Sequence, residues 1–200
     1  MNPLERARRL PSPEAAKALY EEWAECYDAD VFDTMGVTGS RRVADLLAEH
    51  VPDRSMPVLD LGCGTGAVGR HLAEHGFTSL TGVDFSPAML AVAQRRSHYR
   101  RLVEGDLNEP PAFTERFAAS VSAGTFTTGH VTADAVPRLI DLHARGATIV
   151  WSVAPPFWPD FDAALRAAAV EILTSAPEPI RRDGAAHDRS HMVVGIVGSG

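Results

Sequence analysis

The sequence is poor in cysteine, in long apolar runs and in net basic charge. Two cysteines in 200 residues, Cys26 and Cys63, cannot form a disulfide framework or a metal-ligand cluster, so we expect a reducing, cytoplasmic location and no bound metal. No segment is long and apolar enough to span a bilayer, and the basic N-terminus lacks the apolar stretch of a secretory signal. The formal charge of -7 argues against nucleic acid and anionic membranes as partners.

The chain also lacks internal repeats and low-complexity tracts. Its length fits one domain, which we expect to be a monomer or a homodimer. Within this domain we expect residues 1–50 to form an N-terminal helical extension or lid. Residues 51–200 are expected to form the core that carries the chemistry.

An apolar run that ends in a cluster of glycines organises this core. Residues 58–69 read V-L-D-L-G-C-G-T-G-A-V-G, which predicts a strand, a tight turn and the start of a helix. Glycine is required at Gly62, Gly64 and Gly66 because the turn needs backbone angles that a Cβ disfavours, and because a ligand must approach the main chain. Cys63 fits between them as a small buried residue and is expected to take part in cofactor binding with the loop. We therefore expect this loop to bind a cofactor.

The loop alone does not identify the cofactor. Residues 64–69 match the dinucleotide pattern G-x-G-x-x-G, which also occurs in nicotinamide and flavin enzymes. Asp60 ends the strand beside the loop, where a carboxylate would repel a pyrophosphate but attract the ammonium and sulfonium groups of S-adenosylmethionine. The alternative is that Asp60 only caps the turn.

Two paired motifs add a family resemblance. The stretch D-L-G-C-G-T-G at 60–66, followed by G-V-D-F-S at 82–86, resembles the class I S-adenosylmethionine-dependent methyltransferases. This resemblance implies an α/β Rossmann-like fold: a seven-stranded, mostly parallel sheet with helices on both faces and an antiparallel last strand. More narrowly, Y-E-E-W-A-E-C-Y-D at 20–28 and G-T-F-T-T-G-H-V at 124–131 resemble the methyltransferase-like family named for the Williams-Beuren chromosomal region.

The second strand is expected at 79–83 and leads to Asp84, 22 residues beyond Gly62. A carboxylate there can accept hydrogen bonds from both ribose hydroxyls, although a helix cap is the alternative. Phe85 could stack on the adenine, and Ser86, which we also expect at the cofactor site, caps the next helix. The resembling fold places Met89 near the adenine, whereas its helical spacing equally fits the core.

Further site residues are implied by the resemblance. It assigns Asp106 to the adenine amino group, with the Leu107 backbone beside it; a turn aspartate is the alternative. It assigns Tyr27 to the methionine end of the cofactor, where Tyr20 could join it or pack in the core. It gives Gly124 and Thr125 backbone contacts to the cofactor, and it directs Phe126, Thr128 and His130 toward the methyl acceptor. Of these three, His130 could act as a general base, although a lone histidine is often structural.

The remaining elements follow from periodicity and from breaker residues. We expect helices from residue 13 and over 41–50, 68–75, 88–96, 134–143 and 161–174, and strands over 101–107, 117–123 and 147–153. Residues 30–40 are expected to form a loop, and 180–182 with 191–197 a closing hairpin. The aromatic, proline-rich segment 155–159 is expected either to wall an apolar substrate pocket or to form a packed turn.

Together these patterns predict an S-adenosylmethionine-dependent methyltransferase that acts on a small-molecule acceptor and releases S-adenosylhomocysteine. No Asn/Asp-Pro-Pro-Tyr tetrapeptide, typical of nucleic-acid amino methylases, is present. One alternative is an NAD(P)-dependent oxidoreductase, which Asp60 and the absence of a recognisable Tyr-x-x-x-Lys pair disfavour. The other is a non-catalytic protein that binds the same cofactor.

Overall fold

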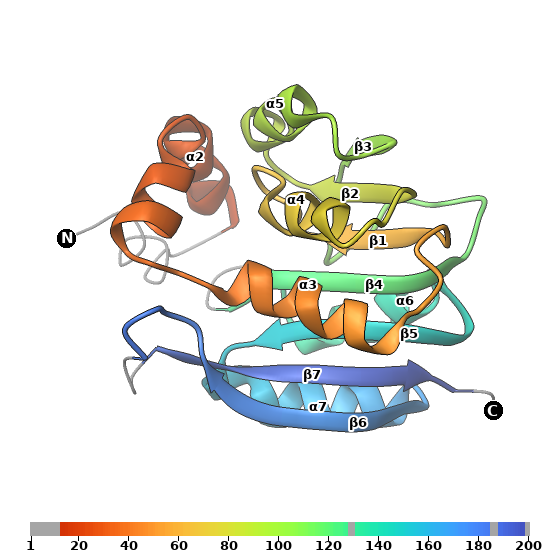
Figure 1. The fold of residues 1–200 in the computed structure, drawn as a ribbon. Helices are drawn as coiled ribbons and strands as arrows, with labels where there is room; N and C mark the ends of the chain where they lie inside the picture. Colours follow the sequence, from red (N-terminus) through yellow and green to blue (C-terminus); the bar gives the residue numbers. More distant parts are fainter. Residues whose placement is uncertain (1–12, 128–130, 185–187, 199–200) are drawn as a thin grey trace.

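A seven-stranded sheet forms the centre of the molecule (Figure 1). The computed structural model describes residues 13–127, 131–184 and 188–198. The strands are β1 (Val58–Leu61), β2 (Leu80–Asp84), β3 (Arg101–Glu104), β4 (Phe117–Phe126), β5 (His143–Val153), β6 (Val170–Pro179) and β7 (Arg189–Val197). The α-helices are α2 (Pro13–Trp23), α3 (Gly39–His50), α4 (Ala67–Glu74), α5 (Pro87–Arg96), α6 (Val136–Ile140) and α7 (Trp158–Ala167). Short helical segments are η1 (Ala29–Thr34), η2 (Ala133–Ala135) and η3 (Pro155–Phe157).

The strands lie in the order β3-β2-β1-β4-β5-β7-β6. Strands β3, β2, β1, β4 and β5 pair in parallel, whereas β7 is antiparallel to both β5 and β6. The predicted seven-stranded, mostly parallel sheet with an antiparallel last strand is therefore confirmed. In such sheets ligands bind at the edge formed by the carboxyl ends of the strands.

Both faces of the sheet are buried, as the continuous apolar runs of its central strands require. Successive side chains of a strand point to opposite faces. In β1, Leu59 and Leu61 accordingly join the cluster under α6 and α7, whereas Val58 joins the cluster under α3 and α4. Figure 1 shows the two helical layers on opposite sides of the sheet. Helix α5 contacts β2 and β3, and α2 packs on α5.

The C-terminal part differs from the sequence prediction. The helix expected over 161–174 ends at Ala167, and Ala169 has a positive φ of 58° that turns the chain out of the helix. Residues 170–179 then form the edge strand β6, so the hairpin strand expected at 180–182 lies earlier in the chain. Pairing with β7 over this whole stretch outweighs its helical periodicity. Pro177 and Pro179 are compatible with β6 because it is an edge strand, where missing backbone donors cost little.

Other boundaries shift less. The expected loop at 30–40 contains the π-helical segment η1, and α3 already begins at Gly39. The helix expected over 134–143 is confined to η2 and α6. The strand expected over 101–107 ends at Glu104, whereas the strand expected over 117–123 continues to Phe126 as β4. In the described part of the chain, none of the helices combines the length and apolarity needed to cross a membrane.

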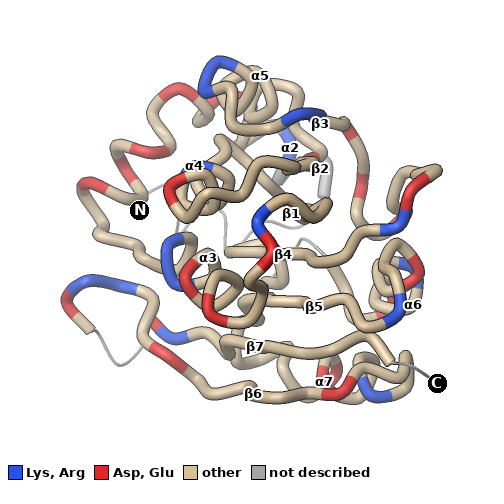
Figure 2. Tube along the Cα trace, turned by 45° about the vertical axis from the view of Figure 1, so that its right-hand side comes forward, with Lys and Arg blue, Asp and Glu red and all other residues tan. Residues whose placement is uncertain are grey.

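Basic residues gather at the end of α5 and the start of β3 (Figure 2). Arg95 and Arg96 pair with Glu25 and with Asp28 of the N-terminal segment, which we define as residues 13–35. Because acids of this segment neutralise both guanidinium groups, their charge is not free to attract a polyanion.

Candidate functional site

The glycine loop lies where the carboxyl ends of β1 and β2 meet. Gly62, Gly64 and Gly66 have positive φ angles of 72°, 52° and 88°, as the sequence predicts. At Gly62 a Cβ would lie 2.1 Å from Thr125 Oγ1, so the loop packs directly on the end of β4. At Gly64 a Cβ would meet nothing within 4 Å, which leaves the backbone open to a ligand.

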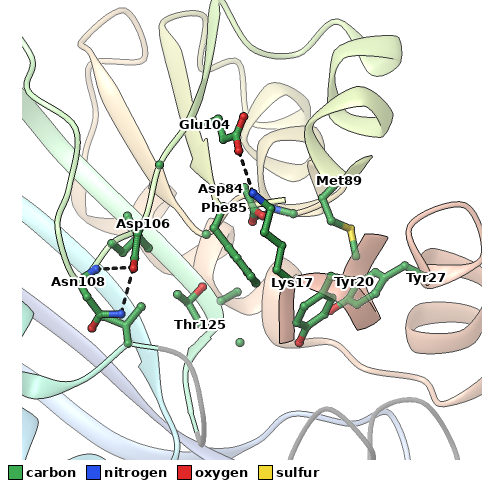
Figure 3. A pocket seen from close by; sticks show the side chains of 17 residues that line it. Lys17, Tyr20, Tyr27, Asp84, Phe85, Met89, Glu104, Asp106, Asn108 and Thr125 are labelled. Atoms are coloured by element: carbon green, nitrogen blue, oxygen red, sulfur yellow. Dashed lines mark hydrogen bonds and ion pairs between the residues drawn. The ribbon is translucent and has the colours of Figure 1, made fainter. Parts of the chain in front are cut away.

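A cavity of about 300 Å³ opens beside this loop, and we call it the first cavity (Figure 3). Most of the predicted cofactor residues line it: Tyr20, Tyr27, Gly62, Gly64, Asp84, Phe85, Met89, Asp106, Leu107, Gly124 and Thr125. Six further residues line it, none of which belongs to a motif of the sequence that predicts cofactor binding: Lys17, Glu104, Gly105, Asn108, Ala123 and Val131. The parallel register pairs Asp84 with Glu104, so strand alignment could have found Glu104. Lys17 carries no local signal because its place depends on how α2 packs.

Four predicted cofactor residues lie elsewhere. The Ser86 hydroxyl is buried and caps α5 by accepting from Met89 N at 3.3 Å. Cys63 lines a second cavity, whereas Gly66 packs on the ring of Tyr99. Asp60 lies in β1, before the loop, and the residue is 1% exposed. These four residues do not line the first cavity, so their contacts with the cofactor stay predictions.

Asp84 reaches the first cavity from the end of β2. Its Oδ2 accepts from Gly64 N at 2.8 Å and its Oδ1 from Ser86 N at 2.9 Å. Burial raises the pKa of Asp84 to about 6, although these backbone donors act in the opposite direction. One carboxylate thus ties the glycine loop to the start of α5 and keeps lone pairs for a ligand.

The Asp60 carboxylate accepts a hydrogen bond from a single donor among the described residues. Tyr99 donates its hydroxyl to Asp60 Oδ2 at 2.6 Å, while Oδ1 is buried without a partner in the described part of the chain. Burial raises the pKa of Asp60 to about 7; the Tyr99 hydrogen bond lowers it and the charge of Asp84 raises it. Asp60 is therefore partly protonated near neutral pH.

This shift predicts a pH-dependent stability. A carboxyl whose folded pKa lies above its unfolded value of about 3.9 binds its proton more tightly when folded. The free energy of unfolding should therefore fall as the pH rises from about 4 to about 7. In Asp60→Asn, which is neutral throughout, that loss should shrink by on the order of 3 to 4 kcal/mol. Urea unfolding of both proteins at pH 4 and pH 8 measures the difference, and an equal change of the free energy of unfolding in both proteins would contradict the assignment.

An aromatic cluster covers the first cavity on the side of the N-terminal segment. Tyr20 meets Phe85 edge to face with ring centroids 6.0 Å apart, and Tyr27 meets Trp23 at 4.7 Å. Burial raises the pKa of both tyrosines far above neutrality, so both remain uncharged. The Trp23 indole also donates to Asp30 at 2.7 Å. These contacts give the cavity an apolar, water-excluding wall.

The second cavity, of about 340 Å³, adjoins the first and shares Tyr20, Tyr27, Gly62, Gly64, Ala123 and Gly124 with it. Phe32, Phe126 and Phe157 give it further aromatic lining. The segment expected either to wall a pocket or to form a packed turn takes part through Pro155, Pro156 and Phe157. Thr128 and His130 lie outside the described residues. Within the described ranges no three metal-ligating side chains cluster.

The first cavity fits an adenosyl ligand with a positive charge. Asp84, Glu104 and Asp106 surround it with carboxylates, and Phe85 offers an aromatic ring. The backbone at Gly124 also has a positive φ, of 78°, and a Cβ there would meet nothing within 4 Å. Hydrogen-bond acceptors for hydroxyl and amino groups therefore surround an open backbone cradle.

Comparisons with known proteins agree with this geometry. Residues 58–146 match the family model described as a methyltransferase domain. Human methyltransferase-like protein 27 is 37% identical over 133 residues, which are 64% of this chain and 54% of that protein. The dTDP-3-amino-3,6-dideoxy-alpha-D-glucopyranose N,N-dimethyltransferase of Streptomyces fradiae is 37% identical over 144 residues, which are 68% of this chain and 54% of that protein. The chain spans about half the length of these two curated relatives.

A solved structure shares the fold. The S-adenosylmethionine-bound amino pentose methyltransferase of Micromonospora echinaspora matches with a TM-score of 0.62 and 22% identity, covering 78% of this chain and 89% of that one. The narrower resemblance inferred from residues 20–28 and 124–131 is supported by the human relative. Residues 58–146 accordingly match a methyltransferase domain, and the chain is similar to known methyltransferases, among them human methyltransferase-like protein 27.

Proposed function

We propose that this protein transfers a methyl group from S-adenosylmethionine in the first cavity to a small-molecule acceptor in the second. The observation that carries this proposal is that the two cavities share a wall formed by Tyr20, Tyr27, the glycine loop, Ala123 and Gly124. A methyl donor bound in the first cavity and an acceptor bound in the second would come together at this shared wall. When bound, S-adenosylmethionine supplies a methyl group activated by its sulfonium, so alignment and exclusion of water are the main tasks of the protein.

The roles follow from position. Asp84 is proposed to accept hydrogen bonds from the ribose, Phe85 and Met89 to contact the adenine, and Asp106 with Leu107 to bind its amino edge. Tyr20, Tyr27, Gly124 and Thr125 are proposed to surround the methionine part and the methyl group. His130 as a general base also remains a proposal, because methyl transfer to many nucleophiles needs no base.

A small molecule is favoured over a macromolecule by the second cavity. Its walls are mostly aromatic and aliphatic, and within the described ranges its charged lining consists of Arg181, Asp188 and Arg189. Arg181 binds Asp188 at 3.3 Å, so part of this charge is internally compensated. The names of the Streptomyces and Micromonospora relatives also specify sugar substrates. An apolar molecule with a few polar groups fits such a lining.

The test is a methyl-transfer assay with S-adenosylmethionine labelled on the methyl carbon. Purified protein is incubated separately with a small-molecule extract and with a protein extract from one cell lysate. The comparison is Asp84→Asn at a low S-adenosylmethionine concentration, where its weaker cofactor binding is expected to reduce transfer. The proposal is supported if label appears in small-molecule products with the wild-type protein and is reduced with Asp84→Asn. Label only in proteins, or S-adenosylhomocysteine binding without any transfer, contradicts it.

We also propose that the N-terminal segment acts as a lid. Thr65 of the glycine loop donates to Asp28 Oδ1 at 2.6 Å, and Arg96 of α5 pairs with the other oxygen. Lys17 reaches Glu104 at 3.0 Å across the first cavity (Figure 3). The segment is thus attached to three elements that border the cavity.

Replacing Asp28 should loosen this lid. In Asp28→Ala, we expect S-adenosylhomocysteine affinity to fall about 5- to 20-fold, since one loss unpairs both Thr65 and Arg96. Hydrogen exchange over residues 13–35 should become faster. The control is Glu25→Gln, which removes an exposed ion pair with Arg95 that should contribute little. Equal affinity in both variants would exclude a lid role for Asp28.

A cytoplasmic location remains part of the proposal. Cys26 and Cys63 are both free, and Cys63 is buried, which is compatible with a reducing compartment.

A further inference from the structure

The Tyr99 hydroxyl forms hydrogen bonds to residues on both sides of the glycine loop. Tyr99 lies in the connection between α5 and β3, and its hydroxyl donates to Asp60 Oδ2 at 2.6 Å. The same oxygen accepts a hydrogen bond from Gly69 N at 3.1 Å. Asp60 belongs to β1, before the loop, and Gly69 lies in the first turn of α4, after it. One phenol oxygen therefore joins the strand and the helix between which the loop runs.

The ring of Tyr99 explains the third glycine of the pattern. A Cβ at Gly69 would lie 2.4 Å from the ring carbon Cζ and from the hydroxyl oxygen of Tyr99. At Gly66 it would lie 3.1 Å from Cε2. Gly69 does not have a positive φ, so the close approach of this ring, not the backbone angle, accounts for glycine there.

The hydroxyl has a separate role from the ring. A helix leaves its first backbone N–H groups without intrahelical partners, and the residue that precedes α4, Gly66, has no side chain to cap them. Tyr99 supplies an acceptor for one of these donors from a distant part of the chain. Among the described residues, Tyr99 is also the one hydrogen-bond donor to the Asp60 carboxylate. A phenylalanine would fill the same space but satisfy neither group.

We propose that Tyr99 is a positioning residue, whose hydroxyl holds β1 and α4 at the separation that the glycine loop needs to bind the cofactor. The inference rests on the proposed cofactor site, since it assigns Tyr99 an effect on that site through the loop. It adds a residue outside the first cavity to those that determine cofactor affinity.

The test compares wild type with Tyr99→Phe by calorimetric titration with S-adenosylhomocysteine from pH 6 to pH 9, with thermal unfolding in parallel. We expect about a tenfold or greater loss of affinity with cooperative unfolding retained. The groups that face Asp60 are Tyr99, Asp84 and Cys63. Since the Tyr99 hydrogen bond lowers the pKa of Asp60, its removal should also move the pH midpoint of binding upward.

A second pair of variants separates the hydrogen bond from general packing. Asp60→Asn keeps an oxygen that accepts from Tyr99, whereas Asp60→Leu has a similar size and no acceptor. Affinity should be lost in Asp60→Leu and not fall further when Tyr99→Phe is added, while Asp60→Asn should bind more tightly than Asp60→Leu.

Three results would overturn the role of Tyr99: unchanged affinity and pH profile in Tyr99→Phe, additive losses in the double variant, or loss of cooperative unfolding in Tyr99→Phe. The last would assign the hydroxyl to global folding. If wild type itself does not bind S-adenosylhomocysteine, the proposed function fails instead, so the two failures are distinguishable.

Discussion

Gly62→Ala is expected to abolish measurable binding of S-adenosylhomocysteine. The new methyl group would lie 2.1 Å from Thr125 Oγ1 and 2.8 Å from its Cγ2, at a residue with a φ of 72°. Either the loop or the end of β4 must move, and both border the first cavity. We expect at least about a 100-fold loss of affinity and a fall of about 2 to 4 kcal/mol in the free energy of unfolding. Calorimetry and urea unfolding measure the two effects.

Two further variants identify the cause. Gly146→Ala has a similar φ of 78° but meets nothing within 4 Å, so it reports backbone strain without a clash. Its affinity should remain that of wild type. Adding Thr125→Ala to Gly62→Ala removes the two closest atoms and should restore part of the stability. If Gly62→Ala binds normally, the packing of the loop on β4 is not required for the site.

Asp84→Asn should have the next largest effect. Asp84 accepts backbone donors from both the glycine loop and the start of α5, and it is proposed to accept the ribose hydroxyls as well. An asparagine keeps the size but has one acceptor oxygen in place of two. Since hydrogen bonds to charged groups contribute about 1.5 to 3 kcal/mol, we expect about a 10- to 100-fold weaker affinity for S-adenosylhomocysteine.

The matched control is Asp160→Asn, at an exposed aspartate in the first turn of α7 outside the lining of both cavities. It should bind like wild type. Titrations at pH 8, above the pKa of about 6 for Asp84, compare the charged carboxylate with the amide. If both variants retain wild-type affinity, Asp84 has no direct contact with the cofactor.

The sequence predicts the fold well where local chemistry dominates. The glycines at 62, 64 and 66 and the cap at Ser86 are determined by backbone angles and by one hydrogen bond, and the structure shows each of them. The C-terminal region is different, because β6 forms through its pairing with β7. Alanine-rich helical periodicity continues past Ala167, and only the long-range pairing determines where the strand begins.

The same distinction applies to the site. Asp84 ends β2 and Asp106 lies just after β3, and because these parallel strands end at one edge of the sheet, both residues reach one cavity. The Asp60 carboxylate accepts a hydrogen bond from Tyr99, 39 residues away along the chain. No local sequence pattern reveals this contact or the burial of Asp60. Lys17 likewise reaches the cavity only through the packing of α2 on α5.

Calorimetric titration of the wild-type protein with S-adenosylmethionine, S-adenosylhomocysteine and NADH in parallel shows which cofactor the first cavity binds. The first cavity is expected to bind both sulfur nucleosides with micromolar affinity, and each should compete with the other, while NADH gives no heat of binding. Binding of NADH alone would contradict the account, because it would mean that the glycine loop holds a pyrophosphate in spite of the carboxylates around it.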